Sequence, residues 1–142
     1  MIIEVKYHHP QLEKLQSLQI GDWIDLRSAE DVTLRQGGHY YISLGVSMRL
    51  PEGYEAHVAP RSSSFQKWGI LQTNSVGVID NSYSGTNDIW KLSVYATRDA
   101  EIHLNDRICQ FRILERMPHI TFHEVDALDK QDRGGFGSTG VR

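Results

Sequence analysis

Alternation of apolar and polar residues is the dominant pattern along the chain. It is clearest in residues 39–44, 54–59 and 91–97, which are also rich in β-branched and aromatic side chains. A period of two with this composition predicts β-strands. Turn signals separate these stretches about every ten residues, an interval typical of a sandwich, a jelly roll or a barrel. The turn signals are Gly37-Gly38, Pro51-Glu52-Gly53, Ser84-Gly85 and Asn105-Asp106.

Two segments, one near each end of the chain, depart from the strand pattern. Leu12, Leu15 and Leu18 recur on one helical face, which predicts one short helix over Pro10–Leu18. After Leu128 the composition becomes charged over residues 129–133 and Gly-rich over residues 134–140, as is typical of a mobile arm. We therefore predict an all-β domain over residues 1–128 with one short N-terminal helix, and a flexible C-terminal arm over residues 129–142.

Size and charge limit the classes of function. The 142 residues, 39% hydrophobic and 23% charged, suffice for one globular domain. A net charge of -3 without any run of Lys or Arg argues against a nucleic-acid partner. No apolar stretch approaches the roughly 20 residues that cross a bilayer, and the N-terminus does not resemble a signal peptide. We therefore expect no membrane partner and a cytoplasmic location.

The metal-ligating residue types do not form a convincing cluster. His119 and His123 have the spacing that chelates zinc on a helix, but the residues between them favour a strand. On a strand, two residues four apart are separated by about 13 Å, too far to share one ion. The single cysteine, Cys109, cannot form an internal disulfide, as expected of a protein from a reducing compartment, and is expected to pack as a small apolar residue. We assign no metal site built from protein ligands alone.

Two segments carry side chains suited to binding a nucleotide. Arg61-Ser62-Ser63-Ser64 follows a predicted strand that ends at Pro60, and its guanidinium and hydroxyls suit phosphate oxygens, although a polar turn is the alternative. Residues 74–85 read as an apolar hairpin arm that ends in Asp80 and is followed by Tyr83. Such a hairpin can fold around a flat ligand. The alternative is that Asp80 only caps a turn.

The Gly-rich tail is a third candidate. Its exposed N–H groups and the hydroxyls of Ser138 and Thr139 suit phosphate, and Phe136 suits a base, although a flexible linker has the same composition. Residues 135–140 match the pattern G-x-G-x-x-G, but no helix can follow before Arg142. No Lys precedes Ser138, so a Walker A loop is also excluded.

Five segments in this order resemble the motifs of the homotrimeric dUTP pyrophosphatase (dUTPase) family, in its bacterial or phage form. The resemblance implies a jelly-roll-like β domain and a homotrimer. Its active sites would lie at the subunit contacts, each closed by a C-terminal arm. The five segments are Ile24-Asp25-Leu26-Arg27-Ser28, Pro60-Arg61-Ser62-Ser63, residues 74–85, Asn105-Asp106-Arg107-Ile108-Cys109-Gln110 and residues 133–140.

The resemblance also implies a role for individual residues. Asp80 activates the attacking water and contacts the deoxyribose 3′-hydroxyl, and Tyr83 packs against the sugar so that a ribose 2′-hydroxyl clashes. Asn74 and the hairpin backbone at Gly77, Val78 and Ile79 read the uracil edge. Arg61, Ser62, Ser63 and Gln110 hold the triphosphate, and Asp25 supports the water shell of Mg²⁺. Phe136, Gly137, Ser138 and Thr139 close over base and phosphates.

Three departures from the family pattern stand out. Arg133, the arm arginine assigned to the γ-phosphate, lies closer to Phe136 than usual, and Gln131 occupies the expected position. Thr86-Asn87-Asp88 replaces the acidic residue that usually follows the hairpin glycine, so no role is assigned there. Gly21-Asp22-Trp23 replaces the small-residue lead-in of the first motif. Trp90 is expected in the core or an interface, with a place near the arm as the alternative.

The implied reaction is attack of water at the α-phosphorus of dUTP, giving dUMP and pyrophosphate. It would limit uracil incorporation into DNA and supply dUMP for thymidylate synthesis. Such chemistry needs positioning, charge neutralisation and an aligned nucleophile, with Mg²⁺ held mainly by the phosphates. The alternatives are a phage-type regulatory binding protein on the same fold, a catalytically silent jelly-roll module, and a dCTP deaminase, which would need a Glu base where the hairpin offers Asp80.

Overall fold

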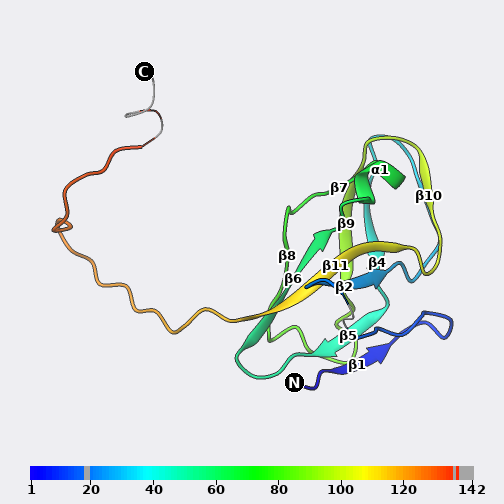
Figure 1. The fold of residues 1–142 in the computed structure, drawn as a ribbon, viewed down its shortest axis with the longest axis horizontal. Helices are drawn as coiled ribbons and strands as arrows, with labels where there is room; N and C mark the ends of the chain where they lie inside the picture. Colours follow the sequence, from blue (N-terminus) through cyan, green and yellow to red (C-terminus); the bar gives the residue numbers. More distant parts are fainter. Residues whose placement is uncertain (18–19, 136, 138–142) are drawn as a thin grey trace.

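In the computed structural model, which describes residues 1–17, 20–135 and 137, strands account for almost all the regular structure (Figure 1). One short helix, α1, occurs among the described residues. The strands are β1 (Glu4–Tyr7), β2 (Ile24–Arg27), β3 (Val32–Leu34), β4 (His39–Ser43), β5 (Val46–Arg49), β6 (Tyr54–Pro60), β7 (Ile70–Gln72), β8 (Gly77–Ile79), β9 (Lys91–Ala96), β10 (Ala100–Ile102) and β11 (Arg107–Glu115), and α1 spans Ser64–Trp68.

Two antiparallel sheets form most of the body. One has the order β2-β11-β6-β8 and the other the order β4-β9-β7, while β1 pairs with β5 and β10 with β3. The three strands predicted from alternation are β4, β6 and β9, and their apolar positions point inward. In β9, for example, Leu92, Val94 and Ala96 are buried. The prediction of an all-β, jelly-roll-like fold with one short helix is therefore confirmed, although the helix lies elsewhere in the chain.

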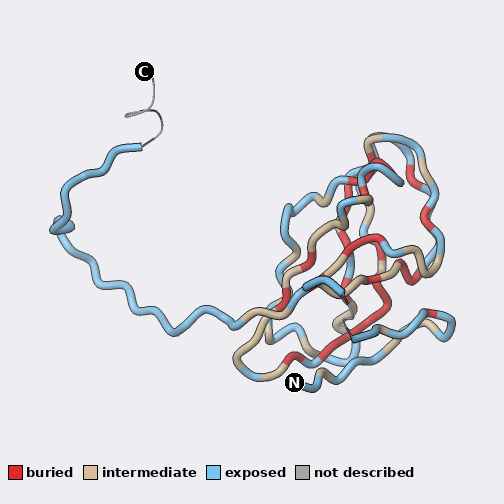
Figure 2. Tube along the Cα trace, viewed as in Figure 1, coloured by how far each residue is buried: buried red, intermediate tan, exposed pale blue. Residues whose placement is uncertain are grey.

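The core lies between these sheets (Figure 2). Trp90 is fully buried, and its ring meets that of Phe111 edge-on with 5.3 Å between the centroids, a favourable aromatic geometry. This confirms the expectation that Trp90 is a core residue. Cys109 is also fully buried, as predicted for a small apolar residue. Burial raises the pKa of the Cys109 thiol far above its ordinary range, and the nearby charge of Asp25 adds to the effect, so the thiol stays protonated.

The predicted helix over Pro10–Leu18 is wrong in its described part, because none of residues 10–17 is helical. Side chains satisfy the backbone instead. The Leu15 N–H donates to the Tyr7 hydroxyl at 2.8 Å, and the Asn105 amide bonds the backbone on both sides of Leu12 at 2.8 and 2.9 Å. Leu12 is buried and Leu15 is partly buried in an irregular segment. The spacing of Leu12 and Leu15 therefore reflects burial of one side of an irregular segment and not helical hydrogen bonding. Leu18 lies outside the described residues.

The C-terminal segment leaves the body after β11, and residues 115–135 are all exposed (Figures 1 and 2). The expected strand around His119 and His123 is not formed, because nothing in the described chain pairs with this stretch. No group of three or more potential metal ligands occurs among the described residues. No helix anywhere in the described residues is long and apolar enough to cross a membrane. The division of the chain at residues 128 and 129 stays a prediction.

Gly45 provides a test of the packing between the N-terminal segment and the body. Its φ is +67°, and a Cβ there would lie 2.6 Å from Ala29 Cβ and 2.9 Å from Leu12 Cδ2. Gly37, with φ +85°, has nothing within 4 Å of the same position. We expect Gly37→Ala to cost about 1–2 kcal/mol from the left-handed backbone alone. Gly45→Ala should cost a further ~1–3 kcal/mol from overpacking.

Denaturant unfolding of the two variants measures this difference. Equal losses of unfolding free energy in Gly45→Ala and Gly37→Ala would show that the N-terminal segment moves aside freely and does not pack as described.

Candidate functional site

Asp25 lies at the centre of a cluster of charged and polar side chains at one end of the larger sheet. Its carboxylate accepts from Arg61 Nε at 2.9 Å and lies 3.5 Å from Arg107 Nη1. Gln110 is opposite Asp25 in the register of β2 and β11, and its Nε2 donates to the Pro60 carbonyl at 3.0 Å. We call Asp25, Arg61, Arg107 and Gln110 the arginine cluster. One carboxylate thus holds two guanidiniums in fixed, partly exposed positions.

A β-bulge makes this cluster possible. In β11 both Ile108 and Cys109 are buried, and the pairing with β2 shifts between Arg107 and Cys109. In a regular strand, residues three apart such as Arg107 and Gln110 would lie on opposite faces of the sheet. The bulge places them on the same face, beside Asp25. Arg107 is a further candidate for binding phosphate, for which the sequence predicted no role. The available signal was its place in the same motif as Gln110.

Buried Ser64 fixes the turn that carries Arg61, Ser62 and Ser63. The Ser64 hydroxyl donates to the Ile108 carbonyl at 2.9 Å and accepts the Arg61 N–H at 3.0 Å. The turn is therefore bonded to β11 through one side chain. Ser62 is exposed, and Ser63 makes no side-chain capping bond to α1. Their hydroxyls lie beside the arginine cluster in the chain and suit the binding of an oxyanion.

The hairpin residues predicted from the sequence lie on and after β8. Asn74, Val78 and Asp80 are exposed, and Gly77 and Ile79 are half-buried. Asn81 fixes the chain next to Asp80, because its Nδ2 donates to the Pro51 and Tyr54 carbonyls at 2.9 Å.

The ring of Tyr83 is 39% exposed, and its hydroxyl donates to the Ile89 carbonyl at 3.0 Å. The Tyr83 N–H donates to the Asp80 carbonyl at 3.0 Å, which closes a turn between the two residues. Tyr83 is thus held at both its backbone and its hydroxyl, and part of the residue stays exposed.

Asp80 opens into a cavity of about 540 Å³. Glu55 lies beside Asp80. The reason is that Ile79 is opposite Ala56 in the antiparallel pairing of β8 with β6, so the next residue of one strand meets the previous residue of the other. Glu55 in turn lies 3.1 Å from His57 Nε2. None of these neighbours was identified from the sequence. The cavity is lined by Glu55, Asp80, Asn81, Ser82, Arg116 and Met117.

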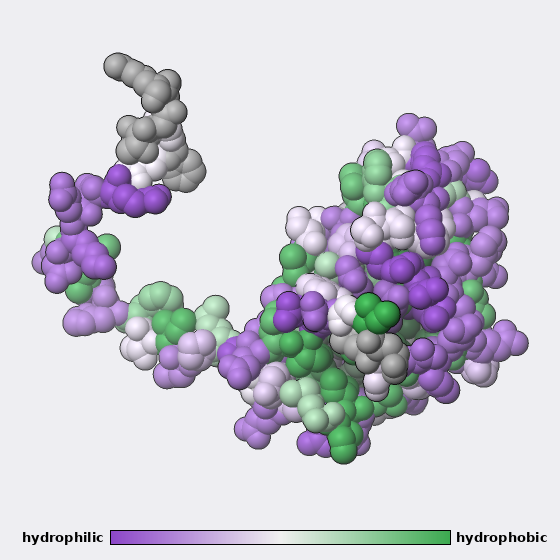
Figure 3. Space-filling view, viewed as in Figure 1, coloured by the Kyte–Doolittle hydropathy of each residue, from purple (hydrophilic) through white to green (hydrophobic). Residues whose placement is uncertain are grey.

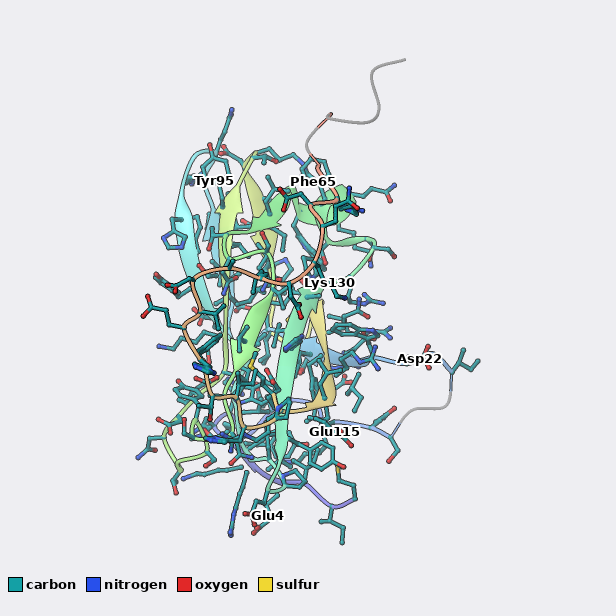
Figure 4. The ribbon with its side chains drawn as sticks, turned by 90° about the vertical axis from the view of Figure 1, so that its left-hand side faces the viewer. Glu4, Asp22, Phe65, Tyr95, Glu115 and Lys130 are labelled. Carbon is teal, nitrogen blue, oxygen red and sulfur yellow. The ribbon has the colours of Figure 1, made fainter. Side chains whose placement is uncertain are left out.

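The structure does not bring Asp80 to the arginine cluster within one chain. Asp80 emerges beside Glu55 at the start of β6, whereas Arg61 follows the end of the same strand. Six residues of extended chain separate Glu55 from Arg61, a span of about 20 Å. Figure 4 shows the two ends of the molecule, with Phe65 of α1 at one end and Glu4 of β1 at the other, and Phe65 follows Arg61 by four residues in the chain. One chain thus carries two separate groups of candidate residues, the Asp80 cavity and the arginine cluster, which we call the two half-sites.

The predicted arm residues form no contact with either half-site in the described part of the chain. Arg133 is exposed and lies on the segment that leaves the body, as does Gly137 (Figure 1). Phe136, Ser138 and Thr139 lie outside the described residues.

Comparisons with known proteins place this arrangement in context. A family model described as dUTPase matches residues 23–140. The SPbeta prophage-derived deoxyuridine 5′-triphosphate nucleotidohydrolase of Bacillus subtilis (strain 168) is 52% identical over 142 residues, which cover 100% of both chains. The deoxyuridine 5′-triphosphate nucleotidohydrolase of Finegoldia magna is 40% identical over 121 residues, covering 82% of this chain and 83% of that protein.

Solved structures show the same fold. A mutant dUTPase of Staphylococcus bacteriophage 80alpha with dUpNHpp has a TM-score of 0.77 at 20% identity, and the match covers 99% of each chain. A mutant dUTPase from phage phi11 of S. aureus, whose structure describes a structural Mg(II) ion, has a TM-score of 0.77 at 17% identity and covers 92% of this chain and 100% of that one.

Removing the Ser64 hydroxyl should loosen the Arg61 turn. Ser64→Ala leaves a buried carbonyl and the Arg61 N–H without their partner, so we expect a loss of about 1–3 kcal/mol of unfolding free energy. The exposed control Ser62→Ala should change stability by no more than ~0.5 kcal/mol. Denaturant unfolding compares the two, and equal stability of Ser64→Ala and Ser62→Ala would contradict the anchoring role of Ser64.

Proposed function

The chain belongs to the dUTPase family and hydrolyses dUTP, and we propose that it does so at a site assembled from two half-sites of different copies of the chain. The observation that carries this proposal is the span of about 20 Å that β6 places between Asp80 and the Arg61 turn. The carboxylate that activates the attacking water must lie close to the phosphates that the arginines bind. Within one chain, Asp80 is too far from the Arg61 turn for this. Two chains placed side by side can bring Asp80 of one copy to the Arg61 turn of the other.

The arginine cluster is the proposed triphosphate site. Arg61 and Arg107 supply charge-assisted donors, and Ser62, Ser63 and Gln110 add hydrogen bonds to phosphate oxygens. Because Asp25 already holds both guanidiniums, the donors are oriented before the substrate arrives. Fixed donors of this kind stabilise the charge that develops on the leaving pyrophosphate.

Magnesium is the proposed cofactor, and the described residues fit it as an ion carried by the substrate. Among them no cage of three or more ligand side chains occurs, and the partly exposed Asp25 carboxylate in the cluster suits the water shell of a phosphate-bound ion. When bound, the ion would neutralise phosphate charge during the reaction. Asp25 would orient its water ligands through hydrogen bonds.

Asp80 is the proposed general base. Its exposed carboxylate opens into a cavity, where it would accept a proton from a water directed at the α-phosphorus, releasing dUMP and pyrophosphate. Asn81 and the turn to Tyr83 hold the backbone that carries this carboxylate in place. The same carboxylate would contact the 3′-hydroxyl of the deoxyribose.

The hairpin is the proposed site for base and sugar. Asn74 and the backbone of Gly77, Val78 and Ile79 would read the uracil edge, and the fixed ring of Tyr83 would leave no room for a ribose 2′-hydroxyl. Such a division of roles selects dUTP over UTP by shape.

A homotrimer is the proposed assembly. The segment that leaves the body exposes the apolar side chains of Met117 (71%), Phe122 (92%) and Leu128 (83%), and their burial against another copy would be favourable (Figure 3). Packing of this segment against a neighbouring copy would cover these side chains and bring Arg133 and the Phe136–Thr139 stretch over a neighbour's site. A cytoplasmic location is proposed with it, since the unpaired, buried Cys109 suits a reducing compartment.

A nucleotide panel tests the proposed function. The purified chain is incubated with Mg²⁺ and dUTP, UTP, dTTP or dCTP, and pyrophosphate and ammonia are measured. Pyrophosphate release from dUTP alone supports the proposal. Ammonia release from dCTP would identify a deaminase, and no reaction with any nucleotide would favour the regulatory binding role.

Replacing Asp80 should separate binding from chemistry. We expect Asp80→Asn to bind dUTP with near-normal affinity and to turn it over at least ~100-fold more slowly, because the lost function is proton acceptance in the transition state. Single-turnover kinetics and equilibrium titration measure the two effects. Asp99→Asn, at an exposed turn beside Arg35, is the matched control. A single-turnover rate near that of the control would remove Asp80 from the role of base.

A further inference from the structure

The two arms of the hairpin diverge at their base. β7 and β8 flank the turn over residues 73–76, yet β7 pairs with β9 in one sheet and β8 with β6 in the other. Because the arms do not pair with each other, no backbone ladder sets the distance between them. Something else must fix that distance if the hairpin is to hold a flat base.

The side chain of Gln72 spans this gap. Gln72 is the last residue of β7, and its Nε2 donates to the Val58 carbonyl in β6 at 3.1 Å. Val58 is opposite Gly77, which is the first residue of β8. These two residues form the last pair between β6 and β8. A Cβ on Gly77 would lie 3.1 Å from Gln72 Nε2 and 3.1 Å from Val58 Cβ. One amide therefore joins the base of the first arm to the point where the second arm begins.

The tip of the hairpin is fixed separately. The Val76 N–H donates to the Asn74 carbonyl at 2.5 Å, and Ser75 between them has a φ of +56°, so the turn is as tight as three residues allow. The backbone carbonyl of Gln72 also accepts a hydrogen bond from the Ser75 N–H at 3.4 Å. With the tip closed, the separation of the arms depends on what holds their base.

Gln72 fulfils this role at a cost to stability. Its Oε1 is buried and has no hydrogen-bond partner among the described residues. A buried acceptor without a partner destabilises a fold, and an apolar side chain of the same length would avoid that penalty. Residues that violate a rule of folding in this way are concentrated at functional sites.

We propose that Gln72 is a positioning residue that sets the separation of the hairpin arms for the pyrimidine base. The inference rests on the proposed function, because it takes the hairpin as the base site. Gln72 acts through the hairpin backbone at Gly77 and through Asn74. Its bond to Val58 therefore affects the binding of dUTP more than the chemistry at the phosphorus.

Two substitutions test the proposal, with one control. Gln72→Met keeps the length of the side chain and removes both the donor and the unpaired acceptor. We expect an unchanged or higher melting temperature, a KM for dUTP raised about tenfold and a kcat within about threefold of wild type. The control Tyr95→Phe, at an exposed position of β9 opposite Leu71 of β7, lies outside the hairpin and should leave KM unchanged.

Gln72→Glu adds a readout that a purely structural role would not affect. Its carboxylate repels the Val58 carbonyl, but a protonated carboxyl can donate to it, and burial raises the pKa of such a group toward neutrality. The ratio of the KM of Gln72→Glu to that of Gln72→Met should therefore fall as pH is lowered from about 8 to about 6.

The outcomes separate this inference from the proposed function. Wild-type dUTP hydrolysis with an unchanged KM in Gln72→Met would overturn the positioning role alone. A parallel loss of melting temperature and kcat in Gln72→Met would show a structural role and overturn it as well. If the wild-type chain released no pyrophosphate from dUTP, the proposed function itself would fail, and the inference with it.

Discussion

The register of β6 against its two neighbours is the constraint on which the rest of the site depends. β11 pairs along one edge of β6 and places Gln110 opposite Ala59, next to the Arg61 turn. β8 pairs along the other edge and places Ile79 opposite Ala56, so that Asp80 emerges at the far end. An extended strand has a fixed rise per residue, so the distance between the two half-sites cannot be adjusted by side-chain motion. The proposal that the site is shared between copies rests on this geometry.

Within each half-site, bonds inside the chain orient the proposed reactive groups before a substrate binds. Asp25 orients two guanidiniums, Ser64 bonds the turn that carries Arg61 to β11, and Asn81 secures the backbone beside Asp80. Catalysis of phosphoryl transfer relies on such preorganised donors and acceptors, because the protein contributes little covalent chemistry. The hairpin has the same design, with a tight turn at its tip and the Gln72 amide at its base.

The parts of the fold that depend on local pattern were predictable from the sequence, whereas the roles of the site residues stay predictions. The alternation in β4, β6 and β9 and the order of the motifs around Asp25, Arg61 and Asp80 need only the residues themselves. The predicted helix failed because Tyr7 and Asn105, from elsewhere in the chain, bond the backbone of that segment. The bulge at Ile108 and the buried amide of Gln72 depend on partners in other strands, which alternation alone cannot reveal.

The most direct test of the shared site mixes two inactive chains. Asp80→Asn lacks the proposed base and Arg61→Ala lacks a phosphate-binding guanidinium, and the two are unfolded together in equal amounts and refolded, with native mass spectrometry confirming mixed assemblies. In a symmetric assembly with random mixing, a site that takes its hairpin from one copy and its arginine cluster from another is intact in roughly a quarter of cases, so about that fraction of dUTP hydrolysis should return. If both half-sites came from one chain, every site would stay defective, and a mixture without activity would contradict the account.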